Sequence, residues 1–432
     1  MNSLWSETTQ QKSRTTLKQN LEVDVLIVGG GMCGILTAYM LNKKGINNAI
    51  VEAKKIGGGV TKNTTAKITA QHGLIYADLI EKFGKEKAQM YYDANTKAID
   101  KYRLLAKKYA CDFENKVAYV YSTTDRDLLE REAKAYTDLG IISKVIEVTD
   151  LPFNTTFALA MENQAQFHPL KLLYALAEEL DIYESTFIDK IEDNVAYTQE
   201  AMITAKHIVL ATHYPLINIP GLYFTKLYQS RSYVIAIENA SLLDGMYIDQ
   251  NTEGYSFRTY GSLLLIGGGS HRTGKDGGNY GQIEGFIKRT YPEASKKYRW
   301  ATQDCMSLDK VPYIGRHQKG KENLYVASGF NKWGMSGSMV AAEVLTDLII
   351  DGKNEYQELY NPSRSIMRRQ LFSNLTAAAT GLLSIGRPRC AHMGCKLHWN
   401  DPDNSWDCHC HGSRYDEDGH VINNPAKKAI TR

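Results

Sequence analysis

"VDVLIVGGGMCGILTAYMLNKKGINNAIVEA", residues 23–53, decides the fold of this chain of 432 residues. The apolar run at 23–28 predicts a buried strand, the glycines predict a tight turn, and residues 32–44 predict a helix. A second strand is expected to end at Glu52. These elements form one βαβ unit, from which doubly wound α/β domains are built.

The glycines of this unit match a dinucleotide-binding fingerprint. Gly29, Gly31 and Gly34 fill the positions of G-x-G-x-x-G, where the backbone turns tightly, approaches a pyrophosphate and packs helix on strand. The N-terminus of the helix then offers unpaired N–H groups to the phosphates. Glu52 lies where a carboxylate accepts hydrogen bonds from the ribose hydroxyls of adenosine. The motif predicts a nucleotide site that suits NAD or FAD.

Later stretches favour FAD. They are "GGGVTKNTTAKITAQHG" (57–73), "KHIVLATHYP" (206–215), "VPYIGR" (311–316) and "ENLYVASGFNKWGMSGSMVAAEVLTDLI" (322–349). The last is a strand, a glycine-rich loop and a helix, which again points a helix N-terminus at a ligand. Together these stretches resemble the D-amino-acid oxidase, glycine oxidase and sarcosine oxidase superfamily of FAD enzymes over residues 20–355.

This resemblance implies a set of FAD-binding residues. Thr64, Thr65 and Lys67 are included although the arginine-rich pattern of the family is replaced here by "TTAKITAQHG". The residues implied at the ADP half are Gly29, Gly31, Gly34, Glu52, Ala211 and Thr212. Those implied along the flavin and ribityl chain are Gly329, Phe330, Gly334, Met335 and Ser336.

The resemblance also implies the architecture, an α/β fold plus a small β segment. A Rossmann-like FAD-binding domain is expected from about 20–75, 155–229 and 300–357, and an antiparallel-sheet substrate domain from about 76–154 and 230–299. In "YSFRTYGSLLLIGGGSHRTG", Tyr255 and Arg258 are the candidates for substrate contact, because the arginine fork pairs with both oxygens of a carboxylate. A salt bridge of Arg258 between domains is an equal alternative.

Three other residues leave alternatives open. His72 and His168 are isolated histidines, for which a structural role is favoured over that of a catalytic base. Cys305 precedes a methionine in "WATQDCMSLDKVPYIG", and sarcosine oxidases carry their flavin as a thioether on such a cysteine. A buried free thiol is the alternative at Cys305.

A second site is expected near the C-terminus, in "CAHMGCKLHWNDPDNSWDCHCHGS", residues 390–413. The spacing C-x-H, 15 residues, C-x-x-H is a metal-ligand layout. Zinc is one possible metal, although zinc modules usually begin C-x-x-C. We favour the hypothesis that these residues hold an iron–sulfur cluster.

The two ligand boxes, Cys390–His392–Cys395 and Cys408–Cys410–His411, resemble those of a Rieske domain. This domain is expected at 387–432, after a linker at 358–386. The resemblance implies a [2Fe–2S] cluster held by Cys390, His392, Cys408 and His411. It also implies a disulfide between Cys395 and Cys410, and hydroxyl donors to sulfur from Ser413 and Tyr415. Trp399 and Trp406 are expected to pack the hairpin between the boxes, and "NPA" (424–426) resembles the loop that covers the cluster.

This Rieske segment departs from its family in two ways. His409 stands where the family has proline, which adds an unassigned imidazole. The segment is also short for the usual β-rich base. We therefore expect the flavin domain, or a partner chain, to support the cluster loops.

Composition and termini exclude several classes of protein. The net charge of +3 is spread along the chain, so nucleic acid is not an expected partner. The first 20 residues lack an apolar export signal, which favours a cytoplasmic protein. The longest apolar run, 375–386, is shorter than the roughly 20 residues of a transmembrane helix, and we expect a packed helix or a tether there.

The two cofactors together indicate a function. Flavin accepts two electrons as hydride, whereas a [2Fe–2S] cluster carries one at a time. We therefore expect a dehydrogenase that oxidises an amine or amino acid at the C–N bond and passes electrons to a quinone, a ferredoxin or another redox protein. The alternatives are a plain oxidase with a structural C-terminal metal site, and an electron-transfer reductase for a partner protein.

Overall fold

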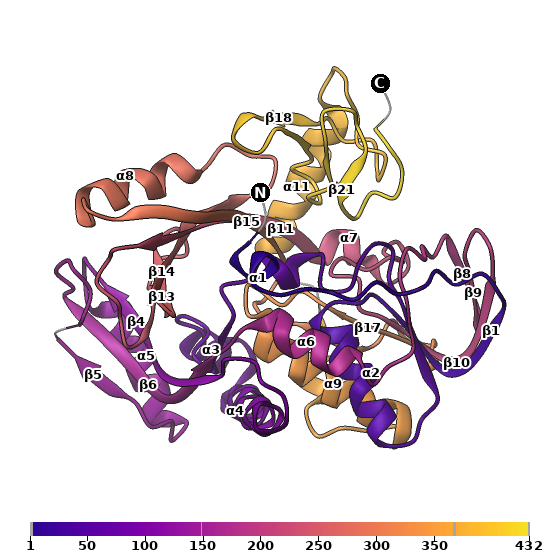
Figure 1. Ribbon diagram of the computed structural model, residues 1–432, viewed down its shortest axis with the longest axis horizontal. Coiled ribbons are helices and arrows are strands. Elements are labelled where there is room, and N and C mark those ends of the chain that lie inside the picture. Colours follow the sequence, from indigo (N-terminus) through magenta and orange to yellow (C-terminus); the bar gives the residue numbers. More distant parts are fainter. Residues whose placement is uncertain (1–2, 148, 366–368, 431–432) are drawn as a thin grey trace.

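The computed structural model describes residues 3–147, 149–365 and 369–430, which form two large sheets, one small sheet and the helices that cover them (Figure 1). The helices are α1 (Leu4–Glu7), α2 (Met32–Lys43), α3 (Tyr76–Phe83), α4 (Lys85–Lys108), α5 (Asp127–Asp138), α6 (Pro169–Ala177), α7 (Tyr223–Lys226), α8 (Tyr280–Thr290), α9 (Gly334–Ile350), α10 (Gln357–Tyr360) and α11 (Arg369–Leu383). None of the helices in these residues combines the length and the apolar character that a membrane span needs.

The first sheet contains the predicted βαβ unit. The strand predicted at 23–28 is observed as β1 and the predicted helix 32–44 as α2, and β1 pairs in parallel with both β2 and β10. The strand order of this sheet is β16 (Tyr313–Arg316), β17 (Leu324–Ser328), β10 (Met202–Leu210), β1 (Leu21–Val28), β2 (Asn48–Val51) and β7 (Ile182–Tyr183). Strand β9 (Val195–Tyr197) also pairs with β10, and β8 (Lys190–Glu192) pairs with β9. The C-terminal ends of β1, β10 and β17 therefore meet at one edge, where ligands bind in such folds.

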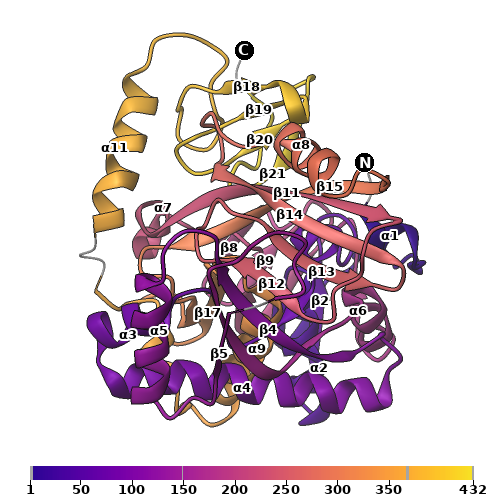
Figure 2. The same ribbon diagram turned by 90° about the vertical axis from the view of Figure 1, so that its left-hand side faces the viewer.

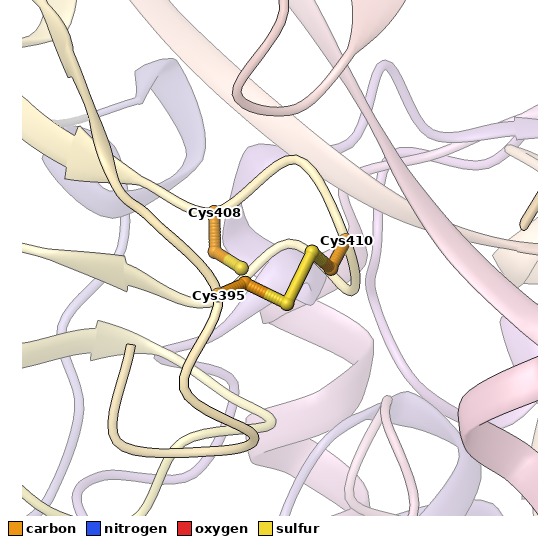
Figure 3. Close-up of side chains that lie close together, drawn as sticks. All are labelled: Cys395, Cys408 and Cys410. Atoms are coloured by element: carbon orange, nitrogen blue, oxygen red, sulfur yellow. A yellow bond between two sulfur atoms is a disulfide. The ribbon is translucent and has the colours of Figure 1, made fainter. Parts of the chain in front are cut away.

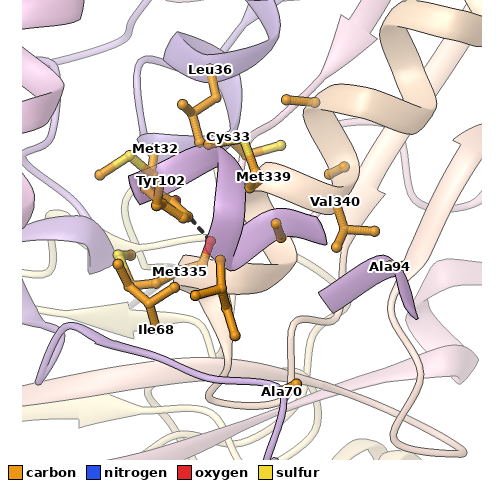
Figure 4. Packing of buried hydrophobic residues seen from close by; sticks show 14 of the residues in the cluster. Met32, Cys33, Leu36, Ile68, Ala70, Ala94, Tyr102, Met335, Met339 and Val340 are labelled. Carbon is orange, nitrogen blue, oxygen red and sulfur yellow. Dashed lines mark hydrogen bonds between the residues drawn. The ribbon is translucent and has the colours of Figure 1, made fainter. Parts of the chain in front are cut away.

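The core below this sheet is formed by α2 and α9, which pack on each other, and α9 also packs on α4. Figure 4 shows Met32, Cys33 and Leu36 of α2 facing Met339 and Val340 of α9. The Tyr102 hydroxyl of α4 donates to the carbonyl oxygen of Met335 at 2.8 Å, as the dashed line shows. This packing fixes the start of α9, where the predicted flavin residues lie.

The second sheet crosses above the first. Its order is β15 (Ser295–Ser307), β11 (Leu227–Glu238), β14 (Leu263–Arg272), β13 (Ser256–Tyr260), β12 (Met246–Asp249), β4 (Glu114–Ser122), β6 (Phe157–Gln166) and β3 (Lys67–Ile68), with β5 (Lys144–Ile146) on β6. It is antiparallel except where β12 runs parallel to β4. Strands β3 and β6 belong to this sheet although the sequence placed them in the FAD-binding parts.

The C-terminal segment forms a small sheet on top of β11 and β15, as Figures 1 and 2 show in yellow. Its strands are β18 (His398–Asn400), β19 (Ser405–Asp407), β20 (Arg414–Tyr415) and β21 (Val421–Asn423). Helix α11 stands at its side in Figure 2 and lies inside the stretch expected as a linker. The apolar run at 375–386 is therefore largely a packed helix, the first of its two expected forms.

Candidate functional site

The glycine loop after β1 has the shape that the fingerprint requires. Gly29 has φ of +116°, and a Cβ there would lie 2.5 Å from the carbonyl oxygen of Ala211. A Cβ on Gly34 would collide with the carbonyl of Gly29. Both positions therefore need glycine for the close packing of α2, β1 and the end of β10.

Glu52 lies beside this loop. Its carboxylate accepts hydrogen bonds from the backbone N–H groups of Gly30 (2.9 Å) and Lys54 (2.8 Å). Burial raises the pKa of Glu52 in spite of these donors. The Thr61 hydroxyl oxygen accepts from the N–H of Met32 at 3.1 Å and so covers one N–H group of α2. Sequence reasoning missed Thr61, although it lies in the threonine-rich stretch that pointed to FAD.

The predicted flavin loop leads into α9. Gly329 has φ of +73°, and a Cβ on Gly334 would meet no atom within 4 Å. The side chain of Trp333 does not cap the helix that starts at Gly334. The N–H groups of this helix end are therefore free for a ligand such as the flavin. Met335 points instead into the core of Figure 4.

His72 and Ser336 form one hydrogen-bonded group. The Nε2 atom of His72 lies 2.9 Å from the Ser336 hydroxyl and 2.7 Å from the Thr69 carbonyl, and Nδ1 lies 2.6 Å from the Tyr91 hydroxyl. Burial lowers the pKa of His72 to about 3. A neutral, fully bonded histidine of this kind orients its neighbours and is a poor base.

Arg258 reaches the stretch that carries Thr64, Thr65 and Lys67. Its Nη1 atom donates to the carbonyls of Thr65 (2.6 Å) and Ala66 (2.9 Å), whereas Nε and Nη2 have no partner among the described residues. Burial and the nearby charge of Arg258 lower the pKa of Lys67 to about 7. A buried guanidinium and a buried amine that is readily deprotonated thus lie near each other in this stretch.

Trp5, in the N-terminal segment, packs against the residues around Thr64 and Arg258. The sequence did not indicate this role. Its indole N–H donates to the carbonyl of Thr64 at 2.7 Å, and the Arg258 guanidinium lies 5.3 Å from its ring centre. Trp5 is fully buried. An isolated tryptophan in a polar N-terminal stretch was the available signal.

Tyr255 does not share a site with Arg258. Its ring stacks on Phe286 of α8 with centroids 4.4 Å apart, and its hydroxyl donates to the carbonyl of Gln282. Phe257, two residues on, packs in the same cluster, so Tyr255 lies on the α8 face of the sheet. Tyr255 and Arg258, three residues apart, therefore point to opposite faces of the second sheet. Contact of either residue with the substrate stays a prediction.

His168 and Cys305 are both buried. His168 caps α6, since its Nδ1 accepts from the N–H of Lys171 at 3.2 Å, and burial lowers its pKa to about 4. The sulfur of Cys305 lies 3.6 Å from the Ser328 hydroxyl, and burial raises its pKa to about 12. Such a thiol resists ionisation, which disfavours its use as a nucleophile.

The four expected cluster ligands converge at the C-terminal segment. Cys390 and Cys408 are buried free thiols, and the rings of His392 and His411 have centroids 4.9 Å apart. The Nδ1 atoms of both histidines are buried and have no partner among the described residues. The Tyr415 hydroxyl lies 3.3 Å from the sulfur of Cys390. Two thiols and two open imidazole nitrogens are the donor set of a Rieske cluster.

The disulfide between Cys395 and Cys410 forms as expected (Figure 3). The sulfur of Cys408 lies beside it, and the three sulfurs are within 4.8 Å of one another. Because the disulfide uses two of them, only Cys408 is left as a ligand in that group. Trp399 and Trp406 pack edge to face, 5.1 Å apart, on the hairpin as predicted.

Flavin-domain side chains hold the second cluster loop, residues 409–412. All four carbonyl oxygens of this loop accept a hydrogen bond from β11, β14 or β15. The pairs are Arg272 Nε with His409 O (3.0 Å), Arg272 Nη2 with Cys410 O (2.9 Å), Gln229 Nε2 with His411 O (3.0 Å) and Gln303 Nε2 with Gly412 O (2.8 Å). The second large sheet thus serves as the base that the short segment lacks.

Other contacts join the same parts. Arg231 of β11 donates to the Asp403 carboxylate at 3.0 Å in a buried ion pair. The Asn218 side-chain oxygen lies 3.1 Å from Nε2 of His392. The Asn424 amide donates to the carbonyl of Thr212 at 2.7 Å. The residue expected next to FAD and the loop expected to cover the cluster are therefore in direct contact.

Comparison with known families agrees with this geometry. The family model described as FAD dependent oxidoreductase (DAO) matches residues 24–348. The chain belongs to this family. The Rieske [2Fe-2S] domain model matches residues 365–432.

Relatives of this FAD-dependent oxidoreductase include one with the same two parts. The Bacillus subtilis (strain 168) protein YhfW, named for a Rieske 2Fe-2S centre, is 34% identical over 99% of this chain and 96% of its own. Gamma-glutamylputrescine oxidoreductase of Escherichia coli (strain K12) is 23% identical over 77% of this chain and 85% of its own. L-proline dehydrogenase from P. horikoshii has the same fold, with a TM-score of 0.68 at 17% identity over 80% of this chain and 98% of its own.

FAD and a [2Fe–2S] cluster are the cofactors of these two domains, and the residues fit both. The glycine loop and the uncapped start of α9 leave the backbone approachable where the family binds FAD. The orphaned Nδ1 atoms of His392 and His411 satisfy the histidine ligation of a Rieske cluster. Gln229, Arg272 and Gln303 were missed because their partners lie more than 100 residues further along the chain.

Proposed function

We propose that this FAD-dependent oxidoreductase oxidises an amine or amino acid at the C–N bond and exports the electrons through its Rieske domain to an external acceptor. The contact between Asn424 and Thr212 carries the proposal, because it joins the loop expected to cover the cluster to a residue expected at the ADP half of FAD. When bound, FAD accepts the electron pair and the cluster carries single electrons. The hydrogen bonds between the cluster loop and the second sheet support a short path between the two cofactor sites.

Side chains at the flavin site support an anionic substrate group. Among the described residues, Nε and Nη2 of the fully buried Arg258 have no partner, and the amine of buried Lys67 has its pKa lowered to about 7. An unpaired buried guanidinium is costly, and a carboxylate would compensate its charge and favour the protonated form of Lys67. We assign Arg258 to orienting a substrate carboxylate, with Trp5 holding the guanidinium plane. The name of the E. coli relative, gamma-glutamylputrescine oxidoreductase, supports an amine as the group of the substrate that is oxidised.

The test is anaerobic mixing of the reconstituted holoprotein with a panel of amines and amino acids. We expect loss of flavin absorption, followed by a Rieske-type EPR signal from the reduced cluster. Flavin bleaching that never produces the EPR signal, with rapid peroxide formation in air, would support the plain oxidase instead. Arg258→Met is expected to raise KM for amino acids at least tenfold and to leave KM for simple amines unchanged.

A further inference from the structure

The outer face of α11 is apolar and turned to solvent. Exposed apolar residues recur along it at the i, i+3, i+4 spacing of one helix face, and we call this set the α11 stripe. The stripe consists of Phe372, Leu375, Ala379, Leu382 and Leu383, and Ile385 continues it just beyond the helix. Phe372 is 61% exposed, Leu383 82% and Ile385 91%. A helix face turned to water is normally polar, so this face is suited to burial in an apolar partner.

The opposite side of α11 is fixed on the protein. Leu371, Asn374 and Ala377 are buried. The side-chain amide of Asn374 donates to the carbonyl of Thr225 in α7 at 3.0 Å, and a Cβ on Gly381 would lie 2.4 Å from the sulfur of Cys410. These contacts set the rotation of the helix about its axis. The α11 stripe therefore points away from the rest of the described chain, at the edge of the molecule that Figure 2 shows on the left.

The apolar surface continues onto the turn at 219–222. The hydroxyl of Thr225 donates to the carbonyl of Leu222 at 2.8 Å, and the carbonyl of Thr225 holds Asn374 of α11. The turn therefore lies close to the first half of α11. Ile219 is 67% exposed and Leu222 46%. Two elements that are far apart in the chain thus present large apolar side chains to solvent near each other.

The sequence around α11 carries an excess of positive charge that the overall charge of +3 does not show. Residues 359–400 contain no aspartate or glutamate, but they contain basic residues on both sides of the uncharged stretch 370–386. These are Arg364, Arg368, Arg369, Arg387, Arg389 and Lys396. Arg364 is buried in an ion pair with Asp309, whereas Arg387 is exposed close to the end of the stripe. The stripe is thus flanked by cations and by no anion in this part of the sequence.

This combination selects a lipid surface over a second protein. Helices that lie in the membrane interface combine Leu and Phe on one face with Lys or Arg beside it, and their apolar face sinks about 5–10 Å into the headgroup region. Leu383 and Ile385 are almost fully exposed, so they protrude from the surface of the protein. A layer of lipid can deform around protruding side chains, whereas a protein partner would need a matching cavity for each. The flanking arginines favour anionic headgroups.

We propose that α11 and the turn at 219–222 dock this protein on an anionic lipid surface. The inference goes beyond the proposed function and does not depend on the substrate. The α11 stripe enters the headgroup layer, and the basic residues beside it face the lipid phosphates. Because α11 packs directly against the disulfide at Cys410, the cluster loop then lies about one helix diameter, about 10 Å, from the lipid. Electrons that leave the cluster would be delivered at the membrane surface.

The test is sedimentation of the cofactor-loaded full chain with vesicles of phosphatidylcholine containing about 30% phosphatidylglycerol. We expect binding to these vesicles that weakens as salt is added. The double variant Phe372→Glu/Leu383→Glu should bind at least tenfold more weakly, because it places two carboxylates in the stripe. The matched control is Leu104→Glu/Ile142→Glu, whose parent side chains are 61% and 81% exposed on α4 and on the loop after α5. This control should bind like the parent chain.

A third variant tests the role of charge. Arg387→Gln should weaken binding to the anionic vesicles about fivefold, the effect expected of one basic residue at such a surface, and should leave binding to pure phosphatidylcholine unchanged. Flavin content and the EPR spectrum of the cluster show whether each variant is folded. All of the substituted positions are exposed, so we expect them to be.

Equal binding of the two double variants, or no binding of the parent chain to anionic vesicles, overturns the proposal. Equal binding to neutral and anionic vesicles overturns the assignment to an anionic surface. A dimer in light scattering that Phe372→Glu/Leu383→Glu dissociates, without vesicle binding, makes the α11 stripe an interface between two copies instead. Flavin reduction by amines is measured without vesicles, so this proposal and the proposed function fail separately.

Discussion

At the scale of single residues, Arg272 combines two tasks. It holds the carbonyls of His409 and Cys410 and brings a positive charge to the cluster loops. A positive charge stabilises the reduced cluster, which is the more negative state. In general, a unit charge at a separation of about 8 Å contributes about 2 kcal/mol at an effective dielectric constant of about 20. We therefore expect Arg272 to affect the reduction potential of the cluster as well as the position of the loop.

We expect Arg272→Met to lower the midpoint potential of the cluster by roughly 30–90 mV, the lower values reflecting solvent screening. Arg272→Lys retains the charge and loses the forked donation, so its potential should stay close to that of the parent protein. EPR-monitored redox titration measures both. Equal shifts in the two variants would show that geometry, and not charge, sets the potential.

His168 shows a pH effect of burial at one residue. Its folded pKa of about 4 lies below the ordinary value of 6.5, so folding favours the neutral ring. The stabilisation is complete above pH 6.5 and is lost as the pH falls through about 4, by about 1.4 kcal/mol per pH unit. Acid should therefore lower the midpoint of thermal unfolding.

His168→Asn keeps a side-chain acceptor for the N–H of Lys171 but does not titrate. We expect its unfolding midpoint to fall less steeply between pH 6.5 and 4 than that of the parent protein, even if it starts lower. Parallel curves for parent and His168→Asn would refute the assignment.

Residue identity could be predicted where chemistry fixes it locally. Gly34 is set by its contact with the backbone of Gly29 inside the fingerprint, and Cys390 and His392 are set by ligand spacing. Arg272 could not be predicted, because its role depends on a carbonyl 137 residues away. The placement of Tyr255 and Arg258 on opposite faces could not be predicted either, because the motif gives the position along the strand but not the face that α8 covers.

At the scale of elements, α11 depends on a close approach. A Cβ on Gly381 would collide with the sulfur of Cys410 and lie 3.1 Å from Nε2 of His409. The apolar run predicted a packed helix or a tether, and periodicity alone could not choose between them. The glycine that permits contact with the disulfide decides for the packed helix.

Gly381→Ala should displace α11 from the disulfide and cost about 1–3 kcal/mol, because neither the sulfur nor the ring can move away freely. Gly285→Ala, within α8, is the matched control. Its nearest neighbour is the end of the Arg289 side chain at 3.5 Å, so alanine should stabilise the helix by about 0.5–1 kcal/mol. Thermal unfolding should therefore shift in opposite directions. A Gly381→Ala protein as stable as its parent would show that α11 packs more loosely than the structure indicates.

At the scale of the whole molecule, the glycine fingerprint and the two ligand boxes predicted both cofactor domains. The sequence did not predict their junction. Strands β3 and β6 lie in stretches that were expected in the FAD-binding domain, but they pair within the second sheet. Strands β11, β14 and β15 of that sheet hold the cluster loop. Such pairings join residues far apart in the chain, so no local pattern records them.

This junction makes the Rieske segment dependent on the flavin domain. Without β11, β14 and β15, the four carbonyls of residues 409–412 lose their donors, and Asp403 loses Arg231. We expect residues 387–432 expressed alone to give no Rieske EPR signal after reconstitution. A chain ending at 357 retains every predicted FAD residue and should bind FAD, with lower thermal stability because Gln229, Arg231 and Gln303 lose their partners. A fragment 387–432 that assembles a stable cluster would show instead that the segment is an independent domain and that the interface serves electron transfer alone.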